Sequence, residues 1–108
     1  MSDLHQQKLT HSTQLTLQLI NEGRSIIEIA NTRRLKVNTI EDHLVEIVLS
    51  DRQFPIGDYV PNKMENKIWE AVNHLQTKQL KVIKQWLKDD EISFFQIRLV
   101  LAKVGDNG

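Results

Sequence analysis

The sequence predicts an all-α fold of about six helices. Apolar residues repeat at intervals of three and four along most of the chain, which is the spacing of one helix face. A Ser or Asn followed three residues later by Glu or Gln precedes four of these runs, and that spacing is typical of a helix start. Both prolines fall in one segment, residues 50–61. The helical runs on either side of it leave little of the chain for a sheet.

A first helix is predicted to begin at Ser12. Its expected apolar face consists of Leu15, Leu19 and Ile20. Gly23 follows at the position where a helix ends in a left-handed cap, which glycine adopts without steric cost. The chain is therefore expected to turn sharply there.

Two more helices are predicted directly after this turn. Ser25 with Glu28, and Asn38 with Glu41, have the spacing of a capping box, in which each residue bonds the backbone N–H of the other. A tight turn separates the two starts. Three helices joined in this way form a helix-turn-helix, which we assign to residues 12–49.

The segment 50–61 is predicted to be an ordered loop, held by its apolar side chains. These are Phe54, Ile56, Tyr59 and Val60. Helical spacing returns over residues 62–104, where Asn62 with Glu65 and Ser93 with Gln96 repeat the capping-box pattern. The last helix is apolar over most of its circumference, which predicts a central position. Its main face is expected to hold Phe94, Ile97, Leu101 and Val104.

The predicted organisation is a flexible lead-in (1–11), a single helical domain (12–104) and a polar tail (105–108). The chain has 108 residues and a net charge of zero, from 14 basic and 14 acidic residues. This balance weakens a nucleic-acid function, because DNA-binding domains usually carry a basic excess. The absence of cysteine excludes disulfides and thiolate metal sites and fits a reducing compartment, so we expect a cytoplasmic protein. We also expect no membrane segment and no secretory signal.

Two runs, residues 21–30 and 34–44, resemble the helicase helix-turn-helix domain. They share the pattern Gly-x-Ser-x-x-x-Ile-Ala followed by Thr-Ile-x-x-His-Leu, and residues 92–102 look like the end of the same domain. This domain lies at the C-terminus of some RecQ-type DNA helicases and of uncharacterised proteins from low-GC Gram-positive bacteria. The resemblance covers residues 12–104 and implies an accessory role beside a RecQ-type helicase.

The candidate DNA contacts surround the predicted turn between the second and third helices. They are Arg33, Arg34, Lys36, Asn38 and Thr39. The basic side chains can bind the phosphate backbone, and backbone N–H groups at a helix N-terminus can meet a phosphate oxygen. The outward face of the third helix, however, is expected to hold three carboxylates. They are Glu41, Asp42 and Glu46. We therefore expect weak DNA binding that is not strongly sequence-specific.

A rival basic surface is predicted on the fifth helix, where four lysines fall on one face. They are Lys78, Lys81, Lys84 and Lys88. The alternative is an ordinary solvated face. Trp69 and Trp86 have the chemistry to stack on bases, but each lies beside an apolar stripe and is expected to be buried or half-buried.

No catalytic residue, cofactor site or metal site is predicted. Glu70 and His74 lie one helical turn apart, but no third ligand is spaced to join them. His43 is expected to pack beside Ile40 and Ile47 with one ring nitrogen hydrogen-bonded.

The primary hypothesis is a non-catalytic accessory module of a RecQ-type helicase system that binds DNA mainly through its phosphate backbone. The alternative is a protein-interaction module that docks a helicase or a second copy without binding DNA. A transcriptional repressor would need two copies with recognition helices about 34 Å apart, and the sequence offers no obvious dimer helix. The partner, the preferred DNA form and the oligomeric state stay open.

Overall fold

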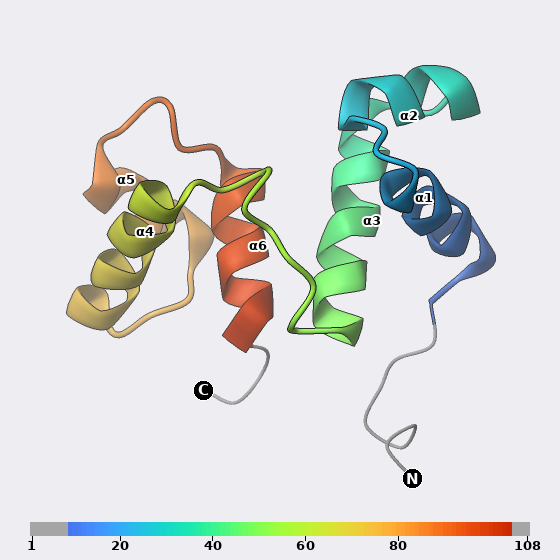
Figure 1. The fold of residues 1–108 in the computed structure, drawn as a ribbon. Helices are drawn as coiled ribbons and strands as arrows, with labels where there is room; N and C mark the ends of the chain where they lie inside the picture. The colour runs from blue at the N-terminus through green and yellow to red at the C-terminus, as the bar shows by residue number, and fades with distance from the viewer. Residues whose placement is uncertain (1–8, 105–108) are drawn as a thin grey trace, which may run out of the picture. The chain divides into compact units, whose positions relative to one another are not determined.

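A computed structural model describes residues 9–104, which form six α-helices and no strand (Figure 1). The helices are α1 (His11–Asn21), α2 (Ile26–Arg33), α3 (Val37–Ser50), α4 (Asn62–Leu75), α5 (Leu80–Leu87) and α6 (Phe94–Val104). The predicted all-α fold with a helix-turn-helix in the N-terminal half is confirmed. No helix among these is long and apolar enough to cross a membrane.

The chain falls into two compact units that divide between Arg52 and Gln53. The first unit contains α1 to α3 and the second contains α4 to α6. That residues 12–104 act as one domain stays a prediction. Residues 1–8 of the predicted lead-in and the tail 105–108 lie outside the described residues, and α1 begins at His11.

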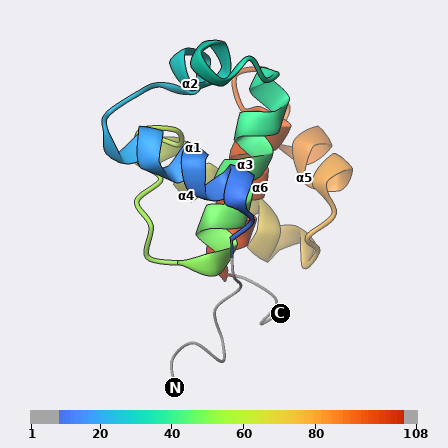
Figure 2. The same cartoon turned by 90° about the vertical axis from the view of Figure 1, so that its right-hand side faces the viewer.

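In the first unit α1 lies across α3, and α2 lies at the N-terminal end of α3 (Figures 1 and 2). All three helices contact one another. Their shared core contains Ile29, Ala30 and Ile40, which are almost completely buried. Partly buried side chains pack around it, namely Leu19, Ile20, Ile26 and Leu35. Burial of this apolar surface is the main force that holds the three helices together.

Both turns of this unit are closed by the backbone. After α1, Gly23 has a φ of 89°, its N–H donates to the Ile20 carbonyl, and the Arg24 N–H donates to the Leu19 carbonyl. After α2, Arg34 has a φ of 58°, and the Leu35 N–H donates to the Ala30 carbonyl. Such bonds satisfy helix carbonyls that would otherwise lack partners. The predicted left-handed cap at Gly23 is confirmed.

The buried face of α1 differs from the prediction. Leu15, expected on the apolar face, is 38% exposed, whereas Thr13 and Thr16 are fully buried. A count of apolar residues misses these threonines because it treats them as polar. Their hydroxyl groups are hydrogen-bonded inside the unit, which removes the cost of burying them.

Two of the four predicted capping boxes form. Glu28 N–H donates to Ser25 Oγ over 3.1 Å, and Ser25 N–H donates to Glu28 Oε1 over 2.9 Å. Ser93 and Gln96 make the same pair of bonds at the start of α6. These two predictions are confirmed.

The predicted caps at Asn38 and Asn62 are wrong. Each residue already lies within its helix, and the cap positions are Lys36 and Pro61, neither of which makes a side-chain cap hydrogen bond. A side chain caps a helix from the non-helical residue before it, so an Asn inside the first turn cannot take that role.

The loop before α4 is ordered and anchored within the second unit, as predicted. Ile56 and Val60 are buried, and the Tyr59 and Phe95 rings meet edge to face with centroids 6.4 Å apart. Gln96 Nε2 donates to the Tyr59 carbonyl over 2.9 Å. The loop is thereby tied to the start of α6.

Helix α6 is buried over most of its circumference, but its face was misassigned. Phe94 is 43% exposed. The buried residues are Phe95, Ile97, Leu99, Val100 and Ala102. Because Ser93 is the cap, Phe94 is the first helical residue, and its side chain is exposed.

Replacing Ser25 by Ala removes the capping box of α2, and we expect the free energy of unfolding to fall by about 1 kcal/mol. Urea denaturation followed by circular dichroism measures the change. Asn38→Ala is the matched control and should cost less, since Asn38 caps no helix. An equal loss for both variants would contradict the assignment of caps.

Candidate nucleic-acid interface

The N-terminus of α3 carries the main candidate site. Lys36 is exposed at the N-cap with extended backbone, and Arg34 is exposed two residues earlier at the end of α2. No side chain caps α3, and its first turn holds no acidic residue. A helix N-terminus has a partial positive charge and N–H groups that point outward. The turn therefore places two cations beside a positive helix end.

Two of the three remaining predicted contacts lie in the first turn of α3. Asn38 is exposed, whereas Thr39 is half-buried. The structure thus brings Arg34, Lys36 and Asn38 to one exposed turn, with Thr39 behind them.

Arg33 does not lie at this exposed turn, because its side chain is hydrogen-bonded to α1. Its Nη1 donates to the Ser12 carbonyl over 2.8 Å and to Thr16 Oγ1 over 2.7 Å, and its Nη2 donates to Ser12 Oγ over 3.0 Å. The half-buried guanidinium therefore joins the end of α2 to α1. Because these bonds use its donors within the protein, they weigh against Arg33 as a phosphate ligand.

Thr16, which accepts from Arg33, also contacts α3. Its hydroxyl oxygen lies 2.7 Å from His43 Nδ1, and His43 is only 7% exposed. Because a guanidinium can only donate, Thr16 accepts from Arg33 and has its own proton left for the ring nitrogen of His43. One hydroxyl thereby connects all three helices of the unit.

The surroundings of His43 favour its neutral form. Burial lowers the pKa of its imidazole, and the positive charge of Arg33 lowers it further, against the opposite effects of Glu46 and Asp42. This agrees with a ring nitrogen that accepts from Thr16. The predicted packed, hydrogen-bonded role of His43 is confirmed.

A second polar contact runs alongside the first. Thr13 Oγ1 donates to Glu46 Oε1 over 3.0 Å. Residues three apart on α1 thus meet residues three apart on α3, since Thr13 pairs with Glu46 and Thr16 with His43. Glu46 was expected on the outward face, and this was wrong because it faces α1.

Sequence reasoning missed the two threonines. Thr13 and Thr16 are three residues apart, as are His43 and Glu46. This spacing indicates a contact only when it is known that α1 packs against α3.

The predicted lysine stripe does not form one helix face. Lys81 and Lys84 lie within α5, Lys78 precedes it, and Lys88 ends it with a φ of 52°. Lys84 Nζ donates to the Asp89 carbonyl over 3.2 Å. Exposed lysines therefore remain on and around α5, but they do not share one helix face.

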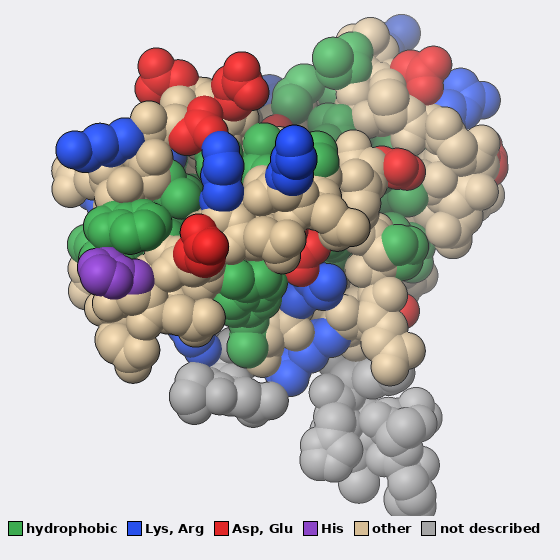
Figure 3. Space-filling view, turned by 60° about the vertical axis from the view of Figure 1, so that its left-hand side comes forward, with side chains coloured by type: hydrophobic (Ala, Val, Ile, Leu, Met, Phe, Trp, Pro, Cys, Tyr) green, Lys and Arg blue, Asp and Glu red, His purple; other side chains and the backbone are tan. Residues whose placement is uncertain are grey.

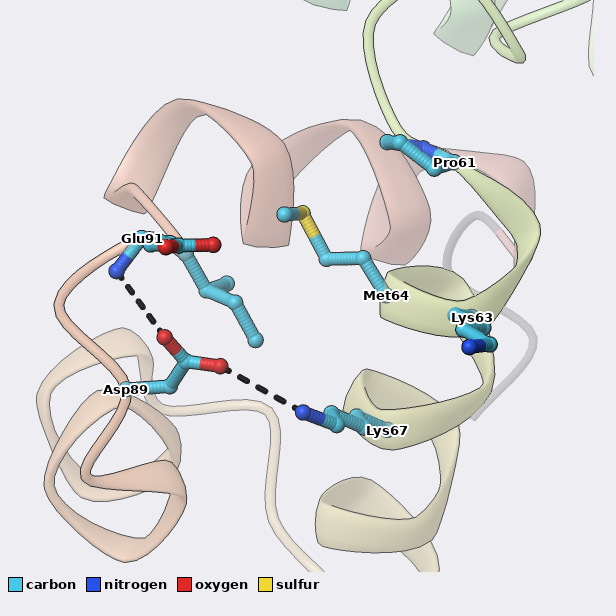
Figure 4. A pocket seen from close by; sticks show the side chains of 7 residues that line it. Pro61, Lys63, Met64, Lys67, Asp89 and Glu91 are labelled. Carbon is cyan, nitrogen blue, oxygen red and sulfur yellow. Dashed lines mark hydrogen bonds and ion pairs between the residues drawn. The ribbon is translucent and has the colours of Figure 1, made fainter.

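A shallow pocket of about 220 Å³ lies between the start of α4 and the segment before α6 (Figure 4). Lys67 Nζ and Asp89 Oδ2 lie 3.5 Å apart across it, and the Glu91 N–H donates to Asp89 Oδ1. This N–H and then Lys67 lower the pKa of Asp89. Lysines and carboxylates therefore line the pocket together.

The two tryptophans differ. Trp69 is half-buried, as predicted, and its indole N–H donates to Glu65 Oε2 over 3.2 Å. Trp86 is 41% exposed, so the expectation that it would be buried or half-buried is wrong. Its ring lies against that of His74, with centroids 5.1 Å apart. Within residues 9–104, no group of three or more His, Asp or Glu side chains is placed to hold a metal ion.

Residues 12–101 match the family described as a helix-turn-helix domain. The chain belongs to this helix-turn-helix family. The match spans both units of the structure.

The chain is also similar to Protein YpbB of Bacillus subtilis (strain 168). The two are 42% identical over 104 residues, which is 95% of this chain and 29% of YpbB. The chain thus spans less than a third of the length of this relative. No solved structure matches the chain.

Protonation of His43 is expected to destabilise the first unit. The pKa of His43 in the folded chain lies below the ordinary histidine value of 6.5, so the unfolded chain binds the proton more tightly. The free energy of unfolding should therefore fall as pH decreases through 6.5 and level off below the folded pKa. Urea denaturation at several pH values measures this slope.

His43→Asn keeps an acceptor for Thr16 without a titrating ring, so it should flatten the slope. His11→Asn, at an exposed position of α1, is the matched control. A slope that survives in the His43 variant would contradict this role.

Proposed function

We propose that this chain is a non-catalytic DNA-binding module that contacts the phosphate backbone through the turn before α3. The contacting residues are Arg34, Lys36 and Asn38, and the Thr39 N–H closes the turn by donating to the Lys36 carbonyl. Membership of the helix-turn-helix family supports DNA as the ligand. Cytoplasmic localisation is part of the same proposal.

The observation that carries the proposal is the lysine at the N-cap of α3. Ser, Thr, Asp and Asn are preferred there because they accept from the helix N–H groups, and a cation is repelled by the helix end. A phosphate oxygen would accept from those N–H groups and pair with Lys36 at once. The local cost of Lys36 is therefore offset by a bound anion.

The same geometry predicts weak binding with little sequence preference. Phosphate contacts fix the position of a protein on DNA but carry no base information. Glu41 and Asp42 follow these residues on α3, and their carboxylates repel the phosphate groups of DNA. The zero net charge of the chain adds no general attraction.

The partner in this proposal is a RecQ-type helicase. The similarity of residues 21–30 and 34–44 to the helicase helix-turn-helix domain supports it. An accessory module that holds DNA weakly would let the helicase move along it.

A protein-docking function is the second candidate. Ile27 on α2 is 65% exposed, and Val37 at the start of α3 is 40% exposed. Exposed apolar side chains favour contact with another protein. This function predicts no DNA binding and loss of helicase capture when Ile27 is replaced by Glu.

Binding of a labelled duplex at two salt concentrations tests the DNA-binding proposal. Arg34→Gly with Lys36→Gln removes both charges while suiting the left-handed backbone at position 34. The double variant should weaken binding and reduce the log–log salt slope by about 1.8.

Arg24→Gln is the matched control, since Arg24 is an exposed arginine at the other turn of the unit. Absence of duplex binding near 50 mM salt, or equal affinity of the double variant and the wild type, would contradict the proposal.

A further inference from the structure

We propose a second nucleic-acid site on the other unit, where Trp86 and His74 form a stacking platform for single-stranded DNA or RNA. This site lies on α4 and α5, away in sequence from the turn before α3. It does not depend on the function proposed for that turn.

The platform consists of two rings from different helices. His74 lies in the last turn of α4 and Trp86 in the last turn of α5, and their ring planes are inclined by 34° with centroids 5.1 Å apart. Val82, one turn before Trp86 on α5, is 36% exposed. Both rings are therefore held by their mutual contact while Trp86 keeps 41% of its surface open.

The segment that carries Trp86 is basic, and Asp89, Asp90 and Glu91 follow it directly. Residues 76–88 include four lysines and no acidic residue, within a chain whose net charge is zero. Lys81 and Lys88 are exposed on this segment. Figure 3 shows a histidine side chain against a hydrophobic one, with both basic and acidic side chains nearby.

The α4 edge of the platform carries a negative charge, because Glu70 lies one turn before His74. A nucleic-acid strand is therefore expected to place its phosphates along the α5 edge, beside Lys81 and Lys88.

The ring chemistry selects single strands over duplexes. In a duplex the base faces are already stacked on each other, whereas an unpaired base can stack on an aromatic side chain. Stacking requires no particular base, because every base has a π-face. The site is thus expected to bind single strands with little sequence preference.

Trp69 offers an internal control on the same unit. It is half-buried, and its indole N–H is held by Glu65, so its ring is less available than that of Trp86. A Trp69→Phe variant leaves Trp86 as the sole tryptophan of the chain, which makes its fluorescence a direct report on stacking.

The experiment uses the full chain with fluorescein-labelled oligothymidine of 15 nucleotides, measured by anisotropy at low salt. Trp86→Ala should lower the affinity about 10-fold, and Trp86→Phe should retain part of it. In the Trp69→Phe background, unlabelled oligothymidine should quench the remaining fluorescence. Lys81→Gln with Lys88→Gln should reduce the log–log salt slope by about 1.4.

Arg34→Gly with Lys36→Gln separates the two sites. It should weaken duplex binding and leave oligothymidine binding unchanged, so either proposal can fail alone. Circular dichroism checks that each variant is folded. No binding of oligothymidine at low salt, or equal affinity of Trp86→Ala and the wild type, would overturn this site. Trp86-dependent capture of a protein or of anionic vesicles without oligothymidine binding would also overturn it.

Discussion

The hydroxyl group of Thr16 is the point on which the helix-turn-helix depends. Thr16 lies on α1. Its hydroxyl oxygen accepts from Arg33 of α2 and lies 2.7 Å from the Nδ1 atom of His43 on α3. The apolar core of Ile29, Ala30 and Ile40 supplies the driving force for packing, but apolar contacts have little directional preference. The hydrogen bonds fix which faces meet, because a buried polar group without its partner is costly.

This arrangement determines which residues are available at the surface. Arg33 is hydrogen-bonded to α1 within the unit. Arg34, the next residue, is exposed because the left-handed backbone at the end of α2 turns the chain. Lys36 then falls at the exposed N-cap of α3, where no side chain caps the helix. The geometry of the proposed interface thus follows from the same contacts that hold the three helices together.

The sequence predicted the elements well where the signal is local. Apolar spacing gave the helices, Gly23 marked the first turn, and the caps at Ser25 and Ser93 depend only on residues three apart. The same spacing misled at Asn38 and Asn62, which lie inside their helices. Prediction also failed where the outcome depends on pairing between helices. Burial of Thr13, the inward position of Glu46 and the task of Arg33 all require a partner helix. Exposure of Trp86 was missed because an apolar stripe beside it suggested core packing.

The central claim is that Arg33 and Thr16 act together to hold the three helices. A double-mutant cycle with Arg33→Met, Thr16→Val and their combination, measured by urea denaturation at neutral pH, tests it most directly. We predict an interaction free energy of at least about 1 kcal/mol between the two positions, because each loses its partner when the other is replaced. Losses that simply add, to within about 0.4 kcal/mol, would contradict the account.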